Sequence, residues 1–399
     1  MSVTAIEGFE AAGIASGIKP SGNPDLALVA TADRRPVTAA GVFTTNLATA
    51  APVQVSRAHL ADGKAAAVVL SSGNANAATG EPGRDDARRM CELTAAGLGL
   101  ATADVLVCST GLIGIPMPME PVESGIPLLC AAIAPGAEAG HRAARAMMTT
   151  DTKSKESLAD ADMGDGRHLH VGGMAKGAAM LQPAMATMLA VLTTDAVVDP
   201  DTLHAALERA VQDSFNALIV DACTSTNDTV LVLANGAAGG PPVGSSGHAY
   251  YALVEALTAV CDDLAHQMAA DAEGATKLAR LTVRGARSSE EARRAARAVA
   301  ASQLVQCSLY GQDPYWGRVL SELGASGAFL DPERVDISYN GVTVCRHGVA
   351  ALHDETALRT SMTQRDIEIV CDLHAGRGEA RVRFTDLTHA YVDENMGTS

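Results

Sequence analysis

One uncharged segment of the chain contains residue types that could perform nucleophilic chemistry. It runs from Gly177 to Thr194, reads GAAMLQPAMATMLAVLTT, and is bounded by Lys176 and Asp195. A threonine inside a chain is a weak nucleophile. It becomes a competent one if the chain is cut on its amino side, because the new α-amine then lies within reach of the hydroxyl. An α-amine titrates at about pH 8, so a useful fraction of it is neutral at cytoplasmic pH.

Thr187 is a candidate for this role. The preceding residue, Ala186, is small, and it leaves room for the Thr187 hydroxyl to attack the Ala186 carbonyl in an N-to-O acyl shift. The chain contains many threonines, and the alternative interpretation of any one of them is a strand residue or a turn hydroxyl. From the residues alone, both interpretations stay open.

A second candidate segment is CSTG, in which Thr110 and Gly111 follow the apolar run Val105–Cys108. Its backbone N–H groups could stabilise a developing oxyanion. The alternative is an ordinary turn at the end of a strand, and composition does not separate the two. A serine hydrolase is not indicated, because the chain has no G-x-S-x-G motif.

Other site classes find little support in the sequence. Neither G-x-x-x-x-G-K-[ST] nor G-x-G-x-x-G follows a predicted strand, so a nucleotide fold is not indicated. The eight cysteines include no C-x-x-C pair, and we interpret them as buried, reduced thiols. His168 and His170 form the tightest histidine pair, which we interpret as two exposed side chains because no third ligand is evident nearby. We therefore expect no metal site and no bound cofactor.

Charge and hydropathy narrow the partners and the location. The formal net charge is −16, which disfavours binding to the phosphates of nucleic acids. The uncharged segment contains Pro183, and a membrane helix needs about 20 predominantly apolar residues, so we reject a membrane span. The first residues, MSVTAIEGFEAAG, have neither a basic start nor an apolar core, which favours a cytoplasmic protein without a signal peptide.

Strands and helices must hold these segments in place. Short apolar runs at Ala66–Leu70 and Val105–Cys108 predict buried strands, and a helical pattern at Arg84–Gly99 separates them. Asp199 and Pro200 predict the start of a further helix. The Gly-rich stretch 236–247 predicts a surface loop.

The last quarter of the chain has a different pattern. A length of 399 residues favours two domains, and we expect the boundary near residue 280. Ser288 and Glu291 predict a capped helix, and Asn340-Gly341 predicts a hairpin between alternating strands. Two further alternating runs on either side of HAGRG predict a second hairpin. A helix with antiparallel strands is therefore expected here, after a mixed α/β first part.

The sequence resembles the ornithine acetyltransferase family, also called the glutamate N-acetyltransferase family. The stretch GGMAKGAAMLQPAMATMLAVLTTDA is similar to the family signature. Further blocks match in order along nearly the whole chain: GIKPSGNPDLALV, GVFTTN, SSGNANAATG, CSTGLIG, MMTTDT, STNDT, DAEGATK, GQDPYWGRV and DLTHAYVDEN.

This resemblance implies a fold and a processing event. The expected fold class is α/β (α+β): an α/β/β/α layered sandwich of the self-processing N-terminal-threonine type over residues 1–280, with a smaller α+β domain over 281–399. Self-cleavage between Ala186 and Thr187 is expected to give an α chain, 1–186, and a β chain, 187–399. We expect two α and two β chains to associate as a heterotetramer.

The resemblance also implies the roles of individual residues. Thr187 is the expected nucleophile, and Thr110 and Gly111 correspond to the oxyanion hole. The positions that correspond to substrate contacts are Thr149, Lys176, Thr187, Glu273, Asn395 and Ser399. One departure concerns Ala179, which stands where the family has glycine and would be strained if the backbone there needed a positive φ.

The implied reaction moves an acetyl group from N2-acetyl-L-ornithine to L-glutamate in arginine biosynthesis. Acetyl-Thr187 is the expected intermediate, which predicts ping-pong kinetics. Lys176, Thr149 and Asn395 could bind the substrate carboxylate, and Glu273 could pair with its ammonium group. Acetyl-CoA is a further expected co-substrate for glutamate acetylation.

Three alternatives remain open from the sequence. A monofunctional or secondary-metabolite paralogue would share all of these blocks. An amidase or aminopeptidase with an N-terminal threonine would pass the acyl group to water. A binding protein would keep its chain uncleaved.

Overall fold

The computed structural model describes residues 2–181, 188–221 and 223–397. The chain packs into two compact units. The first consists of residues 1–177, 184–216 and 224–268, and the second of residues 178–183, 217–223 and 269–399. Two short segments from the middle of the chain therefore belong to the same unit as its C-terminal part. The two processed chains expected from the sequence, 1–186 and 187–399, stay a prediction.

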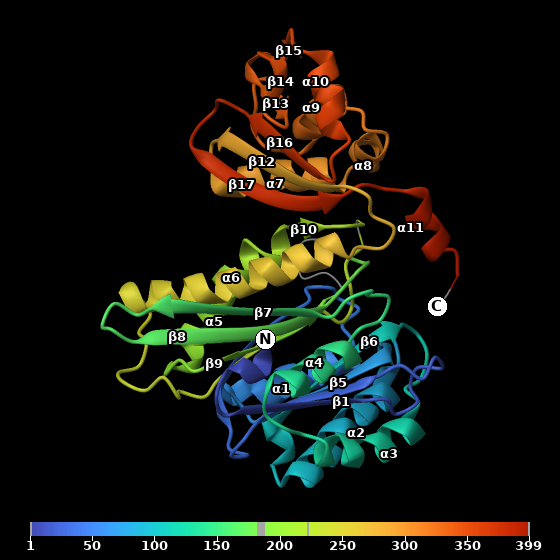
Figure 1. Cartoon of the computed structure of the whole chain (residues 1–399), viewed down its shortest axis with the longest axis vertical. Helices are drawn as coiled ribbons and strands as arrows, with labels where there is room; N and C mark the ends of the chain where they lie inside the picture. The colour runs from blue at the N-terminus through green and yellow to red at the C-terminus, as the bar shows by residue number, and fades with distance from the viewer. Residues whose placement is uncertain (1, 182–187, 222, 398–399) are drawn as a thin grey trace. The chain divides into compact units, whose positions relative to one another are not determined.

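The first unit contains a four-stranded sheet in the order β1-β2-β5-β6 (Figure 1). Its strands are β1 (Phe9–Ile14), β2 (Leu26–Thr31), β5 (Ala67–Asn74) and β6 (Val105–Leu112). Neighbouring strands are antiparallel except β5 and β6, which are parallel. One face of this sheet packs against α1 (Ala51–His59), α2 (Gly80–Leu98) and α3 (Met119–Ala131).

The second sheet of this unit has six strands in the order β4-β3-β11-β9-β8-β7. They are β4 (Lys64–Ala65), β3 (Val37–Phe43), β11 (Thr229–Ala234), β9 (Leu189–Thr194), β8 (His168–Lys176) and β7 (Lys155–Asp162). Only β9 and β11 are parallel; the other neighbouring pairs are antiparallel.

The two sheets pack face to face. One hydrophobic core takes side chains from both, and it also receives α4 (Ala137–Ala146). Two helices cover the far face of the second sheet, α5 (Pro200–Gln212) and α6 (His248–Ala270), and α5 contacts β3. The helix α6 packs closely on β8, because a methyl group added at Gly173 of β8 would lie 2.7 Å from Val260 of α6. Figure 1 shows α6 lying along β7 and β8. The first unit is therefore layered α/β/β/α.

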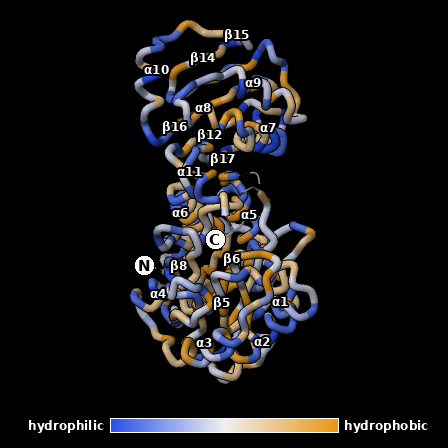
Figure 2. Tube along the Cα trace, turned by 90° about the vertical axis from the view of Figure 1, so that its right-hand side faces the viewer, coloured by the Kyte–Doolittle hydropathy of each residue, from blue (hydrophilic) through white to orange (hydrophobic). Residues whose placement is uncertain are grey.

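Small aliphatic side chains build this core, since aromatic residues make up only 3% of the chain. All six residues of β2 and all six of β9 are buried. Figure 2 shows hydrophobic residues gathered around β5 and β6. At Gly13, a Cβ would lie 2.5 Å from the carbonyl carbon of Arg142, so α4 approaches β1 closely. Small residues thus allow the short distances between layers.

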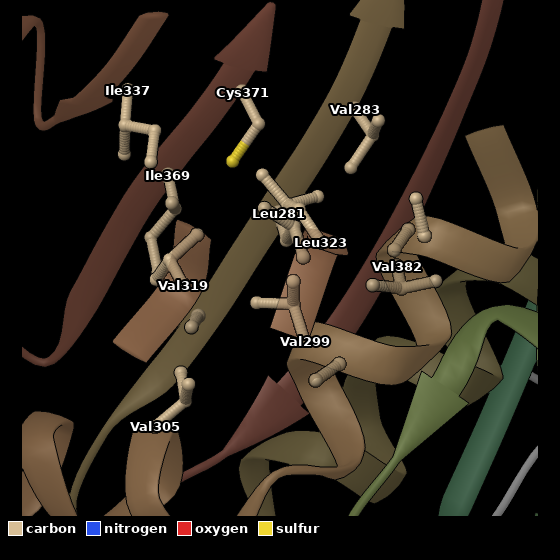
Figure 3. Packing of buried hydrophobic residues seen from close by; sticks show 14 of the residues in the cluster. Leu281, Val283, Val299, Val305, Val319, Leu323, Ile337, Ile369, Cys371 and Val382 are labelled. Carbon is tan, nitrogen blue, oxygen red and sulfur yellow. The ribbon is translucent and has the colours of Figure 1, made fainter. Parts of the chain in front are cut away.

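The second unit is built on a seven-stranded sheet in the order β10-β17-β12-β16-β13-β14-β15. Its strands are β10 (Leu218–Ile219), β12 (Leu278–Ala286), β13 (Asp336–Tyr339), β14 (Val342–Arg346), β15 (Val349–Ala350), β16 (Asp366–Asp372) and β17 (Gly378–Thr385). Its helices are α7 (Ser289–Ala301), α8 (Gln303–Tyr310), α9 (Trp316–Ala325), α10 (Glu355–Met362) and α11 (His389–Glu394). Figure 3 shows residues of α7, α8 and α9 packed on β12 and β16.

Short 3-10 helices occur in both units. They are η1 (Val3–Ala5), η2 (Leu60–Asp62), η3 (Thr102–Asp104), η4 (Phe215–Ala217) and η5 (Pro332–Arg334). In the parts of the chain that the structure describes, no helix is both long enough and apolar enough to cross a membrane.

Several local predictions are confirmed. The Asp199 side chain accepts the N–H of Thr202 at 2.9 Å and caps α5. Ser288 caps α7 by accepting the N–H of Glu291 at 3.2 Å. The β13–β14 hairpin turns at Asn340 and Gly341, which have φ of 48° and 80°. Two residues in the left-handed region are what this tight hairpin turn requires.

The predicted second hairpin is wrong. β16 and β17 do not pair with each other, because β12 lies between them, parallel to β16 and antiparallel to β17. The connecting loop crosses the end of β12, where the N–H groups of Leu373 and Ala375 donate to the carbonyls of Arg284 and Gly285. The turn residues therefore bridge over a strand instead of closing a hairpin.

Candidate active site

The end of β6 is held tightly against β5. The parallel register pairs Ser72 with Thr110 and Gly73 with Gly111. Gly111 has φ of +134°, and a Cβ there would lie 2.5 Å from the backbone nitrogen of Asn74. Side chains are thus excluded at Gly111, and the backbone of the predicted oxyanion hole is fixed by its neighbour strand.

Lys176 lies against Thr110. It is the last residue of β8, is only 3% exposed, and donates from Nζ to the Thr110 Oγ1 at 3.3 Å. The chain thus brings together two of the site residues predicted from sequence, one from each sheet. A buried ammonium beside a strand-end hydroxyl places positive charge where an anionic oxygen could be stabilised.

A carboxylate, Asp151, organises the surroundings of Lys176. Asp151 accepts from Lys155 Nζ at 2.6 Å, from the Gly177 N–H at 2.8 Å and from the Thr149 N–H at 2.9 Å. Burial by itself raises the pKa of Asp151, but the charges of Lys176 and Lys155 and the hydrogen bonds outweigh it and hold the pKa well below its usual range. Asp151 is therefore an anion that fixes Thr149 and the residue after Lys176.

Sequence reasoning missed Asp151 and Lys155 as parts of this cluster. Their side chains are 0% and 1% exposed. The signal in the sequence was the block MMTTDTKSK, which places an acidic residue two positions after Thr149 and a lysine four positions later. Nothing in that spacing alone distinguishes a buried ion pair from two surface charges.

A third lysine, Lys19, also lies close to this cluster. Its Nζ donates to the carbonyls of Pro24 at 2.7 Å and Met148 at 2.6 Å. Burial, opposed by the charge of Asp25 and reinforced by that of Lys176, lowers the pKa of Lys19 to about 8. Sequence reasoning did not single out this residue either.

Thr187 and Ala186 lie outside the described residues, so the predicted nucleophile and cleavage junction stay predictions. The next residue, Met188, is 2% exposed and its N–H donates to Asp228 Oδ1 at 2.8 Å. In the antiparallel pair β8–β9, Leu189 lies opposite Lys176. Thr187 therefore precedes by two positions the residue that pairs with Lys176.

In the second unit, Glu273 and Asn395 are brought together. Asn395 donates from Nδ2 to Glu273 Oε2 at 2.8 Å and to the Tyr391 carbonyl at 2.9 Å. Glu273 is 9% exposed, and its N–H donates to the Ala178 carbonyl at 3.0 Å. It is a buried carboxyl in the loop after α6, not a helix-surface residue. Ser399 lies outside the described residues.

A second buried carboxyl of this unit, Asp221, was missed by sequence reasoning. It accepts the N–H of Met180 at 2.7 Å and the hydroxyl of Tyr391 at 3.0 Å. Burial, only partly opposed by these hydrogen bonds, raises the pKa of Asp221 to about 6. In this segment the left-handed backbone falls on Met180, with φ of 54°, and not on Ala179. The methyl group of Ala179 is therefore free of the strain considered from sequence.

The histidine pair on β8 is exposed, as interpreted from the sequence. The side chains of His168 and His170 are 56% and 49% exposed, and His170 Nδ1 lies 2.7 Å from Asp195 Oδ2. Across the residues that the structure describes, no group of three or more His, Cys, Asp or Glu side chains could hold a metal ion.

The layers and the strand-end cluster define a class of protein. An α/β/β/α sandwich, with its polar cluster where strands of the two sheets end, is the fold of the N-terminal-nucleophile type. The model of the ArgJ family matches residues 10–397. The chain therefore belongs to the ArgJ family, which confirms the resemblance found in the sequence and the expectation of an enzyme of arginine biosynthesis.

Relatives match over nearly their whole lengths. The arginine biosynthesis bifunctional protein ArgJ of Symbiobacterium thermophilum is 47% identical over 395 residues, which cover 98% of this chain and 97% of that protein. The protein of the same name from Mycobacterium tuberculosis H37Rv is 46% identical over 406 residues, covering 100% and 96%.

Two solved structures are also similar. An arginine biosynthesis bifunctional protein ArgJ from Bacillus halodurans is 34% identical and covers 51% of this chain and 95% of its own, with a TM-score of 0.49. Ornithine acetyltransferase from Mycobacterium tuberculosis, complexed with ornithine, is 38% identical and covers 47% and 95%, with a TM-score of 0.41.

Proposed function

We propose that this protein transfers the acetyl group of N2-acetyl-L-ornithine to L-glutamate through an ester on Thr187. The observation that carries the proposal is the buried contact between Lys176 and Thr110, on strand ends of two sheets, beside the strand that begins just after Thr187. The relatives named above are arginine biosynthesis proteins, and they match this chain along nearly its whole length, which supports a reaction of the same pathway.

The first step of the proposal is self-cleavage. The Thr187 hydroxyl attacks the Ala186 carbonyl carbon, and the peptide bond between them is replaced by an ester that frees the Thr187 amine. Water then hydrolyses this ester, restores the hydroxyl, and leaves a carboxylate on Ala186. The products are chains 1–186 and 187–399.

Acetyl transfer then uses the freed amine as a base. The Thr187 hydroxyl attacks the acetyl carbonyl of acetylornithine and gives its proton to the α-amine. Thr110 and Gly111 stabilise the oxyanion, and ornithine leaves with the proton. Glutamate then attacks the acetyl ester through its neutral amine, N-acetylglutamate departs, and the threonine hydroxyl is restored.

Substrate binding is assigned to residues that the family resemblance singled out. Lys176 and Thr149 bind the substrate carboxylate, and Glu273 binds the ammonium of the ornithine side chain. Both amide hydrogens of Asn395 are already used by Glu273 and the Tyr391 carbonyl, which favours a role for Asn395 in orienting Glu273. Ser399 is carried over as a substrate contact from the family resemblance alone.

We also propose a second acetylation reaction and an assembly of the processed chains. The name "bifunctional" of the relatives supports acetylation of glutamate from acetyl-CoA as well, with no bound cofactor. We propose that the chains form a heterotetramer of two α and two β chains and act in the cytoplasm. A monofunctional or secondary-metabolite enzyme would differ in its donor or acceptor, and an amidase or aminopeptidase would use water.

One set of measurements tests the reaction. Intact mass analysis of purified protein is expected to show the two chains, and incubation with acetylornithine should add one acetyl group to the chain that begins at Thr187. Ornithine release should accelerate when glutamate is present, with parallel lines in double-reciprocal plots. An uncleaved chain that transfers acetyl groups at full rate would refute the mechanism. Ornithine release independent of glutamate would instead indicate a hydrolase.

A further inference from the structure

A short segment before β11 links strand ends of the two sheets within the first unit. Asn227 donates from Nδ2 to the carbonyls of Ala75 at 2.6 Å and Ser109 at 2.9 Å. Ser109 directly precedes Thr110. The next residue, Asp228, accepts the N–H of Met188 through Oδ1 at 2.8 Å. Two consecutive residues thus bind the strand of the oxyanion hole and the strand that follows Thr187.

The backbone of this segment is itself firmly held. The Asp228 carbonyl accepts the N–H of Thr44 at 2.9 Å, and the Thr229 N–H donates to the Met188 carbonyl at 3.1 Å. Thr229 also pairs with Leu189 in the parallel register of β11 and β9. Because neighbouring strands fix its backbone, the Asp228 side chain has little freedom to follow a shift of Met188.

Burial of the Asp228 carboxyl lowers the stability of the fold. It is 0% exposed, and among the residues that the structure describes its Oδ2 has no hydrogen-bond partner. Burial raises the pKa of Asp228 well above its usual value, while the Met188 N–H, the Ser225 hydroxyl and the charge of Lys176 act in the opposite direction. A buried, incompletely paired polar group destabilises a fold, and such groups concentrate at functional sites.

We propose that Asp228 is a positioning residue for Thr187. By holding the N–H of the Thr187–Met188 peptide, it sets the place of the nucleophile relative to the Thr110 strand that Asn227 holds from the same segment. This inference rests on the proposed function and adds Asp228 and Asn227 to the residues that the reaction needs. Self-cleavage and acetyl transfer both need the Thr187 hydroxyl in register with the oxyanion hole, so both depend on this link.

Variants of Asp228 separate position from charge. Asp228→Asn keeps an acceptor oxygen for the Met188 N–H and resembles the protonated carboxyl in shape, with an NH2 group in place of the O–H donor. Asp228→Ala removes the acceptor of the Met188 N–H and leaves the Met188 carbonyl bonded to the Thr229 N–H. A misplacement of about 1 Å costs about 100-fold in rate. We therefore expect Asp228→Ala to lower both the cleavage rate and kcat by about that factor, with little change in KM.

Thr193→Val is the matched control. Thr193 is a 0% exposed residue at the far end of β9, and its Oγ1 donates to the Val3 carbonyl at 2.7 Å. Its replacement removes a buried hydrogen bond from the same strand without touching the residues around Met188. It should lower the melting temperature and leave cleavage and kcat at wild-type levels.

The experiment measures cleavage by intact mass, kcat and KM with acetylornithine and glutamate, and melting temperature for the wild type and these variants. Rescue by Asp228→Asn, with loss in Asp228→Ala beyond that of Thr193→Val, supports the proposal. It is overturned if Asp228→Ala behaves like Thr193→Val, or if Asp228→Asn is as impaired as Asp228→Ala. A wild-type protein that neither cleaves nor transfers acetyl groups would instead refute the proposed function.

Discussion

Replacing Gly111 with alanine tests whether the end of β6 acts as an oxyanion hole. The new methyl group would lie 2.5 Å from the backbone nitrogen of Asn74, whereas ordinary contacts begin at 3.4 Å. The two backbones must therefore separate by about 1 Å, because neither atom belongs to a flexible side chain. A donor displaced by about 1 Å loses most of its effect, and we expect kcat to fall about 100-fold or more.

Backbone strain also contributes to this variant, and it must be measured separately. Gly111 has φ of +134°, which side chains rarely adopt, so alanine adds about 1–3 kcal/mol of strain. For a chain of 399 residues, that strain corresponds to a fall in melting temperature of about 1–4 °C. Gly114→Ala is the matched control, because Gly114 has φ of +81° but no atom within 4 Å of the added methyl group.

The assay combines intact mass analysis, steady-state acetyl transfer and thermal unfolding. We expect both variants to lose stability, but only Gly111→Ala to lose acetyl transfer and slow its own cleavage. Wild-type activity in Gly111→Ala would refute the assignment of Gly111 to the oxyanion hole. An equal loss in Gly114→Ala would attribute the defect to strain in the loop instead.

Three further predictions concern buried carboxyls. Asp151→Asn removes the carboxylate from a buried ion pair with Lys155, so urea unfolding should show a loss of about 3–5 kcal/mol, unlike variants of exposed ion pairs. Burial raises the pKa of Asp221 to about 6, so the folded state keeps this proton to a higher pH than the unfolded chain does. Stability should therefore fall as the pH rises from about 4 to 6. Asp221→Asn should abolish that fall, and an unchanged pH profile of stability would contradict the raised pKa of Asp221. Glu273→Gln keeps an acceptor for Asn395 but loses the charge, so KM for acetylornithine should rise about 10-fold to 100-fold, and an unchanged KM would remove Glu273 from substrate binding.

Local sequence signals predicted local structure well. The capped starts of α5 and α7 and the hairpin at Asn340 and Gly341 depend on residues a few positions apart, and the structure has them as expected. The family resemblance singled out Thr110 and Lys176, which lie in contact although they are far apart in the chain.

Long-range packing was not available from the sequence. The insertion of β12 between β16 and β17 depends on a loop crossing a strand end, and alternating patterns look the same for strands that pair and strands that do not. The ion pair of Asp151 with Lys155 and the link from Asp228 to Met188 arise only once the strands are assembled. Their residue types are common on surfaces, so spacing alone gave no reason to select them.

The six-stranded sheet of the first unit contains strands from both sides of the predicted cleavage site, so the two chains should stay together after cleavage. Strands β9 and β11 come from after residue 187, while β3 and β8 on either side of them come from before it. The carbonyls of Ala178 and Leu181 also accept N–H groups from Glu273 and Val220 across the predicted cut. After a cut at this junction, strands of the two polypeptides would still alternate in one hydrogen-bonded sheet. The two polypeptides could separate only if this sheet unfolds, so they should co-purify through every step short of denaturation.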